Sequence, residues 1–251
     1  MGLVFQSSEK PHMHTNGYKV LITGGASGIG LALARRFHAA GNTVVLAGRR
    51  ADALAEAART LPGAQTEVAD ITQDTDRARL LRAHGDTSVL VNNAGIQINR
   101  SLLEQTEADI RRELDTNLIA PVLLTHAFLP VLLRQPQAAV INVSSGLAIV
   151  PKEVASLYCA SKAALHSFSQ TLRWQLEGTP VQVFELLPPL VDTAMTQGRG
   201  QGKISPEALA DAFWHAFSTG HHEVLAGKTR LLALINRLSP ALAQRIMRKG
   251  L

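Results

Sequence analysis

Several features that would mark a specialised class of protein are scarce or missing in this sequence. A single cysteine, Cys159, among 251 residues excludes a disulfide framework within the chain. No run of roughly 18 or more uninterrupted apolar residues occurs, so a membrane-spanning helix is not predicted. The N-terminal residues lack the long apolar segment of a secretory signal, and a reducing cytoplasm is therefore the expected compartment.

Acidic residues are absent from the C-terminal segment, residues 224–251. This segment carries six cations, whereas the rest of the chain has a net charge of −1. A nucleic-acid-binding surface needs its positive charge on the body of the fold or along one stripe. Because the excess belongs to the tail, no nucleic-acid partner is expected.

The remaining composition is that of a globular protein, with 46% hydrophobic and 18% charged residues. Residues 1–17 are polar and without periodicity, which predicts a disordered extension or a remnant of an expression tag. No linker, internal repeat or low-complexity segment follows. We predict one domain over residues 18–251, of which 228–251 form a basic helical tail.

Short β-type runs alternate with helical patterns after residue 18. Several runs are continuous in valine, leucine and isoleucine, as in strands buried on both faces of a parallel sheet. Strands are predicted at Lys19–Thr23, Thr43–Ala47, Gln65–Val68, Val89–Asn92, Ala138–Val143, Val181–Leu187 and Glu223–Ala226. Helices are predicted at Leu31–Ala40, Ala51–Arg59, Gln73–His84, Glu104–Leu114, Leu118–Leu133 and Ala160–Glu177. The alternation predicts an α/β fold, a doubly wound, Rossmann-like parallel sheet of about seven strands with helices on both faces.

A glycine-rich turn, TGGASGIG, follows the first predicted strand and precedes a helical pattern. Glycines at such a turn let the backbone approach a diphosphate, and the next helix N-terminus supplies N–H donors. Turns also use glycine for purely conformational reasons, but the place in the first strand–helix turn favours a nucleotide site. The candidate cofactor-binding residues here are Gly24, Ser27, Gly28, Ile29 and Gly30.

The second predicted strand ends in Gly48, Arg49 and Arg50, and the nearest acid is Asp52 in the following helix. An acid at such a strand end grips the ribose hydroxyl of NAD, whereas an arginine suits the 2′-phosphate of NADP. Two solvated arginines are the simpler alternative. The pair favours NADP(H) as the cofactor.

Two further predicted strands end in residues that point to the same edge of the sheet. Asp70 and Ile71 follow the third strand, where they could flank an adenine. The fourth strand ends in NNAG, which contributes Asn92, Ala94 and Gly95 as candidates. Ligands of open α/β sheets lie beyond the carboxyl ends of the strands. The shared position of these turns supports one cofactor site.

A serine, a tyrosine and a lysine follow the fifth predicted strand. Ser144 stands at its carboxyl end, and Tyr158 and Lys162 are four residues apart, on one face if the segment is helical. A nearby cation favours the phenolate, so Lys162 is expected to lower the pKa of Tyr158. The phenol would then donate a proton to a carbonyl oxygen that Ser144 polarises. Neighbouring Cys159 is expected to be a small packing residue.

TGGASGIG, NNAG, Asn117 in DTNLIAP, Ser144 and YCASK together resemble the short-chain dehydrogenase/reductase family over about residues 18–227. The resemblance implies a catalytic group of Asn117, Ser144, Tyr158 and Lys162, the asparagine holding a water for proton relay. It places Pro188, Val191 and Thr193 at the nicotinamide and diphosphate, and Tyr158 and Lys162 also at the cofactor. The chain departs from the family in having Pro189 where a glycine is usual, which predicts a stiffer loop.

The resemblance implies NADPH-dependent reduction of a carbonyl, reversibly oxidation of a secondary alcohol, by a homo-dimer or homo-tetramer without a metal. The loops at residues 146–157, 97–101 and 190–203 supply apolar side chains, so a small apolar carbonyl or alcohol is the expected substrate. A non-catalytic NADP-sensing or scaffolding module is the alternative, although it predicts a broken tyrosine–lysine pair.

The tail also resembles a branch of the family named for lipoteichoic-acid D-alanylation, a name that fixes no substrate. Leu231, Leu234, Ile235 and Leu238 recur at helical spacing. Packing against the sheet, the substrate mouth or a second subunit is favoured over binding to an anionic membrane or an acidic partner.

Overall fold

The computed structural model describes residues 12–248. Residues 1–11 of the predicted extension and 249–251 of the tail lie outside this range. Residues 12–17 pack on the fold, because Met13 is buried and the Thr15 carbonyl accepts a hydrogen bond from Asn42 Nδ2 at 2.9 Å. The predicted boundary at residue 18 is therefore too late.

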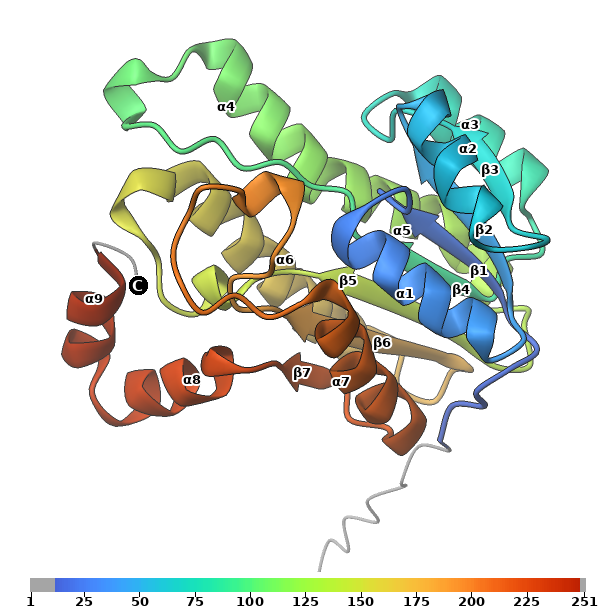
Figure 1. The fold of residues 1–251 in the computed structure, drawn as a ribbon. Helices are drawn as coiled ribbons and strands as arrows, with labels where there is room; N and C mark the ends of the chain where they lie inside the picture. Colours follow the sequence, from blue (N-terminus) through green and yellow to red (C-terminus); the bar gives the residue numbers. More distant parts are fainter. Residues whose placement is uncertain (1–11, 249–251) are drawn as a thin grey trace, which may run out of the picture.

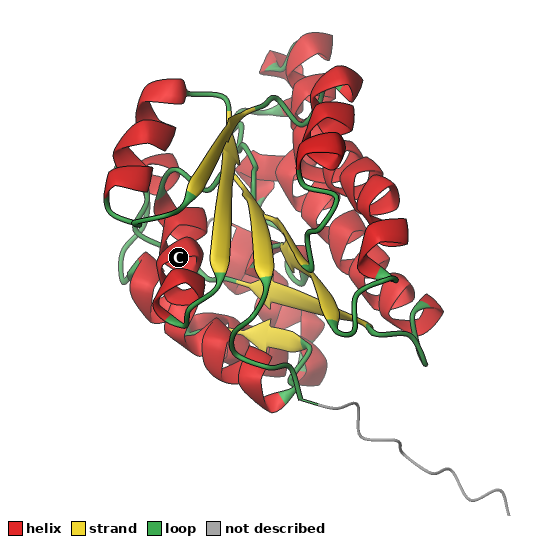
Figure 2. Cartoon of the chain, turned by 90° about the vertical axis from the view of Figure 1, so that its right-hand side faces the viewer, coloured by secondary structure: helices red, strands yellow, loops and turns green. Residues whose placement is uncertain are grey.

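A seven-stranded, all-parallel sheet forms the centre of the fold, with strand order β3-β2-β1-β4-β5-β6-β7 (Figures 1 and 2). The strands are β1 Lys19–Thr23, β2 Thr43–Gly48, β3 Gln65–Val68, β4 Val89–Asn92, β5 Ala138–Val143, β6 Val181–Leu187 and β7 Glu223–Leu225. The order reverses between β1 and β4, and a cleft for ligands is expected outside the carboxyl ends at such a point. The predicted fold class is confirmed, with β2 and β7 differing from prediction by one residue.

Helices cover both faces of the sheet (Figure 2). The first face carries α1 Gly28–Ala39, α2 Ala51–Arg59 and α7 Pro206–Thr219, and the second carries α3 Asp74–Ala83, α5 Ala120–Leu132 and α6 Ser156–Gln175. Helix α4, Glu107–Leu114, continues into α5 through a π-helical turn at Asp115–Ile119. Helix α6 begins four residues before its predicted start, which places Tyr158 inside it. Helix α7 is not among the predicted helices.

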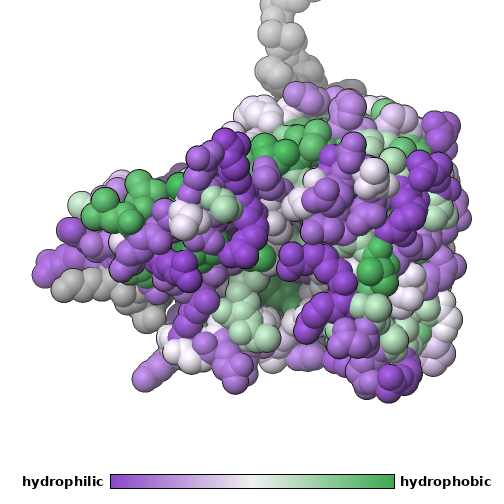
Figure 3. Space-filling model, turned by 90° about the horizontal axis from the view of Figure 1, so that it is seen from above, coloured by the Kyte–Doolittle hydropathy of each residue, from purple (hydrophilic) through white to green (hydrophobic). Residues whose placement is uncertain are grey.

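Two apolar cores hold these layers together. On the first face Phe37 of α1, Phe184 of β6 and Phe217 of α7 are fully buried, and the ring of Phe217 contacts the rings of the other two. On the second face Leu124 and Phe128 of α5 pack against α6 and against the side chains of β4 and β5 that point to this face. Most of the surface seen from above is hydrophilic, with apolar residues gathered in small areas (Figure 3).

The continuous helical stretch Glu107–Leu132 is, among the described residues, long and apolar enough by composition to cross a membrane. Its residues Leu124, Phe128 and Leu132 lie in the second core. A buried core helix passes the same test of length and composition, and packing on the sheet explains the apolar character of this stretch.

The basic tail forms helices α8, Lys228–Leu238, and α9, Pro240–Arg248, which pack beside the loop after β5. The inward side chains are Leu232, Ala243 and Met247, which enclose Val150. The favoured alternative is packing against the sheet, the substrate mouth or a second subunit, and this part of the tail packs on the loop after β5 of its own chain. The apolar face predicted to pack against the protein points mostly outward. Leu231, Leu234 and Leu238 are exposed, and of the four predicted residues Ile235 packs inward.

A buried acid–base pair joins β6 to α6. Glu185 Oε2 lies 2.7 Å from His166 Nδ1, and the Glu185 side chain is fully buried. The hydrogen bond to Glu185 raises the pKa of His166, and the charge of Glu223 acts in the same direction. The charge of Glu185 also raises the pKa of Arg173 on α6, but burial of the guanidinium has the larger effect and lowers it. The pair therefore stabilises the folded state most when His166 is protonated.

Replacing His166 by glutamine should cost stability mainly at low pH. A raised folded pKa means that the contribution is fully present below the unfolded value of about 6.5 and is lost as pH rises through the folded value. Urea unfolding from pH 5.5 to 8.5 should therefore show a wild-type advantage over His166→Gln that shrinks as pH rises. His126→Gln is the matched control, because it removes an exposed imidazole outside this pair. An advantage that grows with pH would contradict the role of the pair.

Candidate active site

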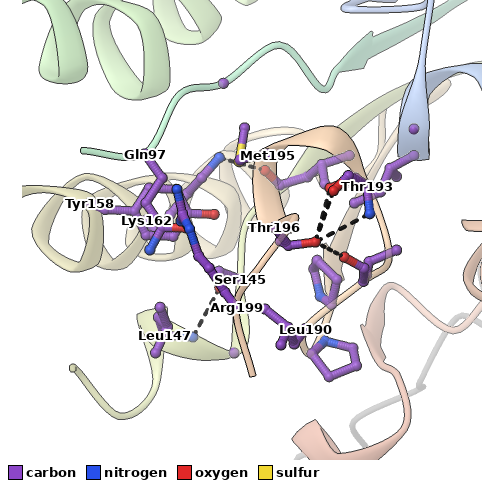
Figure 4. Close-up of a pocket in the computed structure, with 18 of the residues that line it drawn as sticks. Gln97, Ser145, Leu147, Tyr158, Lys162, Leu190, Thr193, Met195, Thr196 and Arg199 are labelled. Atoms are coloured by element: carbon purple, nitrogen blue, oxygen red, sulfur yellow. Dashed lines mark hydrogen bonds between the residues drawn. The ribbon is translucent and has the colours of Figure 1, made fainter. Parts of the chain in front are cut away.

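A cavity of about 360 Å³ opens at the carboxyl ends of the central strands. Predicted site residues that line it are Gly24, Ser27, Gly28, Ile29, Ala94, Gly95, Ser144, Tyr158, Lys162, Pro188, Val191 and Thr193. The predicted residues Gly30, Arg49, Arg50, Asp70, Ile71, Asn92 and Asn117 are not on its wall. Figure 4 shows Gln97, Tyr158 and Lys162 together on one side and Thr193 of the loop after β6 on the other.

The glycine turn between β1 and α1 forms one end of the cavity and cannot carry larger side chains. A Cβ on Gly30 would lie 2.3 Å from the Gly24 carbonyl oxygen. Gly28 has a φ of +53°, and a Cβ there would lie 3.1 Å from Thr193 Cγ2. The bare backbone is therefore required by the packing of α1 and the loop, and it leaves room for a diphosphate.

Asn93 fixes this turn and was not among the predicted site residues. Its Nδ2 donates to the Thr23 carbonyl at 2.9 Å and to the Gly24 carbonyl at 3.2 Å. The preceding Asn92 instead points into the interior, where its Nδ2 donates to Thr125 and Asn142. Asn93, not Asn92, is thus the asparagine of NNAG that lines the cavity.

The residues expected at the adenosine end lie beside the next strand ends. Arg49 and Arg50 are exposed after β2, and Arg50 is the N-cap residue of α2. Asp70 Oδ1 accepts hydrogen bonds from the Thr72 amide and hydroxyl, while Ile71 is buried. The two exposed arginines can therefore meet an anion, whereas one oxygen of Asp70 is already held by its own turn.

Ser145, not Ser144, is the serine beside the tyrosine. Ser144 continues the sheet, since its N–H donates to the Leu186 carbonyl at 2.9 Å and its hydroxyl turns toward the same oxygen at 3.5 Å. Ser145 lines the cavity with Tyr158, and its hydroxyl group acts to lower the pKa of the Tyr158 phenol. The geometry therefore replaces Ser144 with Ser145 as the polar partner of Tyr158.

Tyr158 and Lys162 lie on one face of α6, with Lys162 Nζ 5.7 Å from the centre of the tyrosine ring. Lys162 Nζ donates to the Val143 carbonyl at 2.9 Å. Burial raises the pKa of Tyr158 to about 12 and lowers the pKa of Lys162 to about 8. The expected lowering of the phenol pKa by Lys162 is wrong for this state of the site, because burial is the largest effect on the pKa of Tyr158 and the cation that acts to lower it is Arg199.

Asn117 lies in the π-helical turn between α4 and α5 and is fully buried. Its Oδ1 accepts from the Ile96 N–H at 2.9 Å, and its Nδ2 donates to the Ile96 carbonyl at 2.9 Å. A Cβ on Gly95 would lie 3.2 Å from Asn117 Oδ1 and 3.7 Å from Lys162 Nζ. The structure thus brings Asn117 close to Lys162, and π turns often occur at functional sites.

Glu113 holds the loop after β4 and is a second residue that the sequence did not single out. Its side chain is fully buried, and Oε1 accepts from the Ile98 N–H at 2.8 Å. Burial raises the pKa of this carboxyl group. Its only sequence signal, one acidic residue in a charged helix, does not distinguish it from neighbouring surface acids.

The loop after β6 closes the other side of the cavity. Pro188 accepts a hydrogen bond from the Gly146 N–H at 2.9 Å, and Val191 is buried and bridged to Ile204.

Cys159 is buried, its Sγ accepts from the Lys152 N–H, and burial raises the pKa of the thiol. A buried thiol with a raised pKa is a packing group rather than a nucleophile.

Comparison with known proteins supports the family resemblance that the sequence motifs indicate. The family model of short chain dehydrogenases matches residues 18–203. The uncharacterized oxidoreductase DltE of Bacillus subtilis is 43% identical over 82% of this chain and 86% of its own length. A short chain dehydrogenase from Burkholderia cenocepacia, solved with NADP, has 28% identity and a TM-score of 0.85 over 93% of this chain and 98% of its own.

A Burkholderia phymatum relative solved with NAD shares the fold at 23% identity, with a TM-score of 0.84 over 95% of this chain and 99% of its own. Proteins of this fold therefore hold either dinucleotide. The matched family model, the similarity to DltE and the cavity at the switch point agree on oxidoreduction between carbonyl and alcohol. The chain belongs to the short-chain dehydrogenase/reductase family, on its DltE-like branch.

Proposed function

We propose that this protein is an NADPH-dependent carbonyl reductase in which Tyr158 is the proton donor. The observation that carries the proposal is that Ser145, Tyr158 and Lys162 line one cavity, which also reaches the glycine turn. A sensing or scaffolding module does not need these groups together. When bound, NADPH supplies a hydride to the carbonyl carbon.

The described residues fit a dinucleotide. Gly24, Gly28 and Gly30 form a cradle in which added Cβ atoms would collide with Asn93, Thr193 or the Gly24 carbonyl. The N–H groups at the start of α1 face this cradle and favour a diphosphate. The Lys162 ammonium lies next to Gly95 and would bind the nicotinamide ribose.

Tyr158 holds its proton at Oη across the ordinary pH range, because burial keeps the pKa of the phenol near 12. Ser145 donates to the substrate carbonyl oxygen and keeps it within reach of that proton. Lys162 and Asn117 are placed to return a proton to the phenolate after each turnover, the lysine with a pKa of about 8. This combination favours reduction at neutral pH.

The preference for NADPH rests on Arg49 and Gly48. Arg49 is exposed at the end of β2, and the strand end lacks an acid that would repel a phosphate. A charge-assisted hydrogen bond to a 2′-phosphate contributes roughly 1.5 to 3 kcal/mol, or about 10- to 150-fold in affinity. Arg50 adds a second exposed charge.

Replacing Tyr158 by phenylalanine should abolish most of the activity while leaving the fold and the cofactor site intact. Loss of a general acid typically lowers the rate by about 10²- to 10⁴-fold. The measurement is kcat for NADPH oxidation with a panel of ketones, followed by absorbance. A variant that keeps more than about half of the wild-type kcat would remove Tyr158 from the mechanism.

Ser145→Ala and Ser144→Ala form a matched pair that separates the two serines. Loss of a donor to the reacting oxygen should lower kcat by about 10²-fold in Ser145→Ala. Ser144→Ala should keep kcat within about threefold, since the Ser144 hydroxyl faces the Leu186 carbonyl. The reverse ranking of the two variants would restore Ser144 as the catalytic serine.

Arg49→Ala should weaken NADPH binding at least about tenfold and leave NADH nearly unchanged. Gly48→Asp should invert the preference, because it adds repulsion and a ribose acceptor. The substitution fits, since a Cβ at Gly48 would be 3.8 Å from the nearest atom, of Leu54. The measurement is kcat/KM with both cofactors in the three proteins, and the wild-type preference should fall with salt. A wild type that prefers NADH would refute the cofactor assignment but not the catalytic one.

A further inference from the structure

The wall of the cavity carries positive charge without any counter-charge. Among the described residues that line it are four cations, Lys152, Lys162, Arg199 and Lys228, and no aspartate or glutamate. Leu147, Leu190, Met195, Leu232 and Met247 supply the apolar part of the wall. The sequence predicts an apolar wall from the substrate loops, which include Leu147, Leu190 and Met195, and gives no role to Arg199. The charge makes an uncharged substrate an incomplete match to the wall.

The cations come from different parts of the site. Lys162 belongs to the reacting centre, whereas the glycine turn that suits the diphosphate lies at the other strand ends, after β1. Arg199 belongs to the loop after β6, and Lys228 begins α8, with Nζ 2.9 Å from where a Gly202 Cβ would lie. Arg199 and Lys228 are thus both found at the loop after β6, where they line the cavity.

Arg199 bridges the two loops that flank the mouth. Its Nη1 donates to Gln97 Oε1 at 3.0 Å. In the orientation that satisfies both ends of its amide, Asn99 accepts from Nη1 at 2.6 Å and Nε at 3.1 Å. Gly198 and Gly200 have φ angles of 74° and 55°, so the turn that carries Arg199 depends on glycine on both sides.

The guanidinium is half-buried, and within residues 12–248 its hydrogen-bond partners are neutral amides, with no carboxylate in ion-pair contact. A partly desolvated guanidinium with neutral partners has unused capacity for a planar anion, which it binds through two parallel hydrogen bonds. Arg199 also lies near the reacting centre, since its charge acts on the Tyr158 phenol. An anion held by Arg199 would therefore belong to the same molecule as the carbonyl.

We propose that the substrate is an oxo acid, a ketone whose carboxylate is bound by Arg199 while its carbonyl lies against Tyr158 and its carbon chain against the apolar wall. The inference rests on the proposed reductase function and adds the class of substrate. Gln97 and Asn99 then orient the guanidinium, and the carboxylate replaces one of these amides or joins them. Lys228 contributes a second, longer-range charge at the same loop.

The test compares oxo acids with their methyl esters, which have the same carbon skeleton without the charge. Suitable pairs are acetoacetate, 4-oxopentanoate and 6-oxoheptanoate, each with its ester. The wild type should favour at least one acid over its ester by about tenfold or more in kcat/KM. Arg199→Gln should lose about 10- to 100-fold on that acid, change little on the ester, and keep the KM for NADPH within about twofold.

Two further variants make the result specific. Arg199→Lys retains the charge but not the planar fork, so it should recover only part of the preference. Arg237→Gln removes an exposed cation of α8 that does not line the cavity, and it should behave as wild type. Equal losses on acid and ester in Arg199→Gln would show that Arg199 only positions the loop. A loss confined to NADPH affinity would assign it to the cofactor. Either result overturns the proposal, as does a wild type that prefers the esters.

Calorimetry separates failure of this inference from failure of the reductase function. The same three acids are titrated into the protein saturated with NADP⁺ or NADPH, and no turnover is required. Binding that weakens about tenfold or more in Arg199→Gln supports the carboxylate site even if every carbonyl proves inert. Absence of acid binding by the wild type, together with turnover of neutral ketones, would refute the carboxylate site and leave the reductase standing.

Discussion

The clamp between the β1–α1 turn and the end of β4 is the interaction on which the site depends. Thr23 Oγ1 accepts the N–H groups of Asn93 and Ala94 at 3.0 and 3.1 Å, and the Asn93 amide returns two hydrogen bonds to the turn. It crosses the point where the strand order reverses, so it sets the distance between the glycine turn and the proposed catalytic residues on the other half of the sheet. A substitution that breaks these hydrogen bonds would shift the glycine turn relative to the end of β4.

A second set of buried polar contacts aligns the loops above that clamp. The Asn117 amide forms hydrogen bonds with both the N–H and the carbonyl of Ile96, and Glu113 accepts a hydrogen bond from the Ile98 N–H. Both residues are carried by the helix that runs from α4 through the π turn into α5, whose apolar side is fixed on the sheet. The loop after β4 is therefore held in place by a helix of the core. A loop held in this way can present Gln97 to Arg199 without a large ordering cost when a ligand binds.

The sequence predicts the sheet, the glycine turn and the Tyr158–Lys162 pair, because each is local and periodic. It does not distinguish Ser144 from Ser145, since the choice depends on where the chain leaves the ladder with β6, and Ser144 still pairs with Leu186. It misjudges the pKa of Tyr158 because burial of the phenol is a property of the assembled cavity. Leucines on both sides of α8 likewise hide which face packs inward, and only the contact of Leu232 with the loop after β5 decides it.

The charges around Tyr158 are separated in a way that suits the reaction. Acidic groups lie behind the cavity, where Glu185 supports the charged form of Lys162 against desolvation and Glu113 raises the pKa of Tyr158. The cavity wall is lined by cations and hydroxyl groups, and among the described residues it holds no carboxylate. Reduction of a carbonyl places negative charge on its oxygen before the proton arrives, and fixed positive charge and donors stabilise that charge best where water is excluded. An acid on the wall would oppose this charge. The same absence of acids that protects the developing alkoxide also admits a substrate with a negative charge of its own.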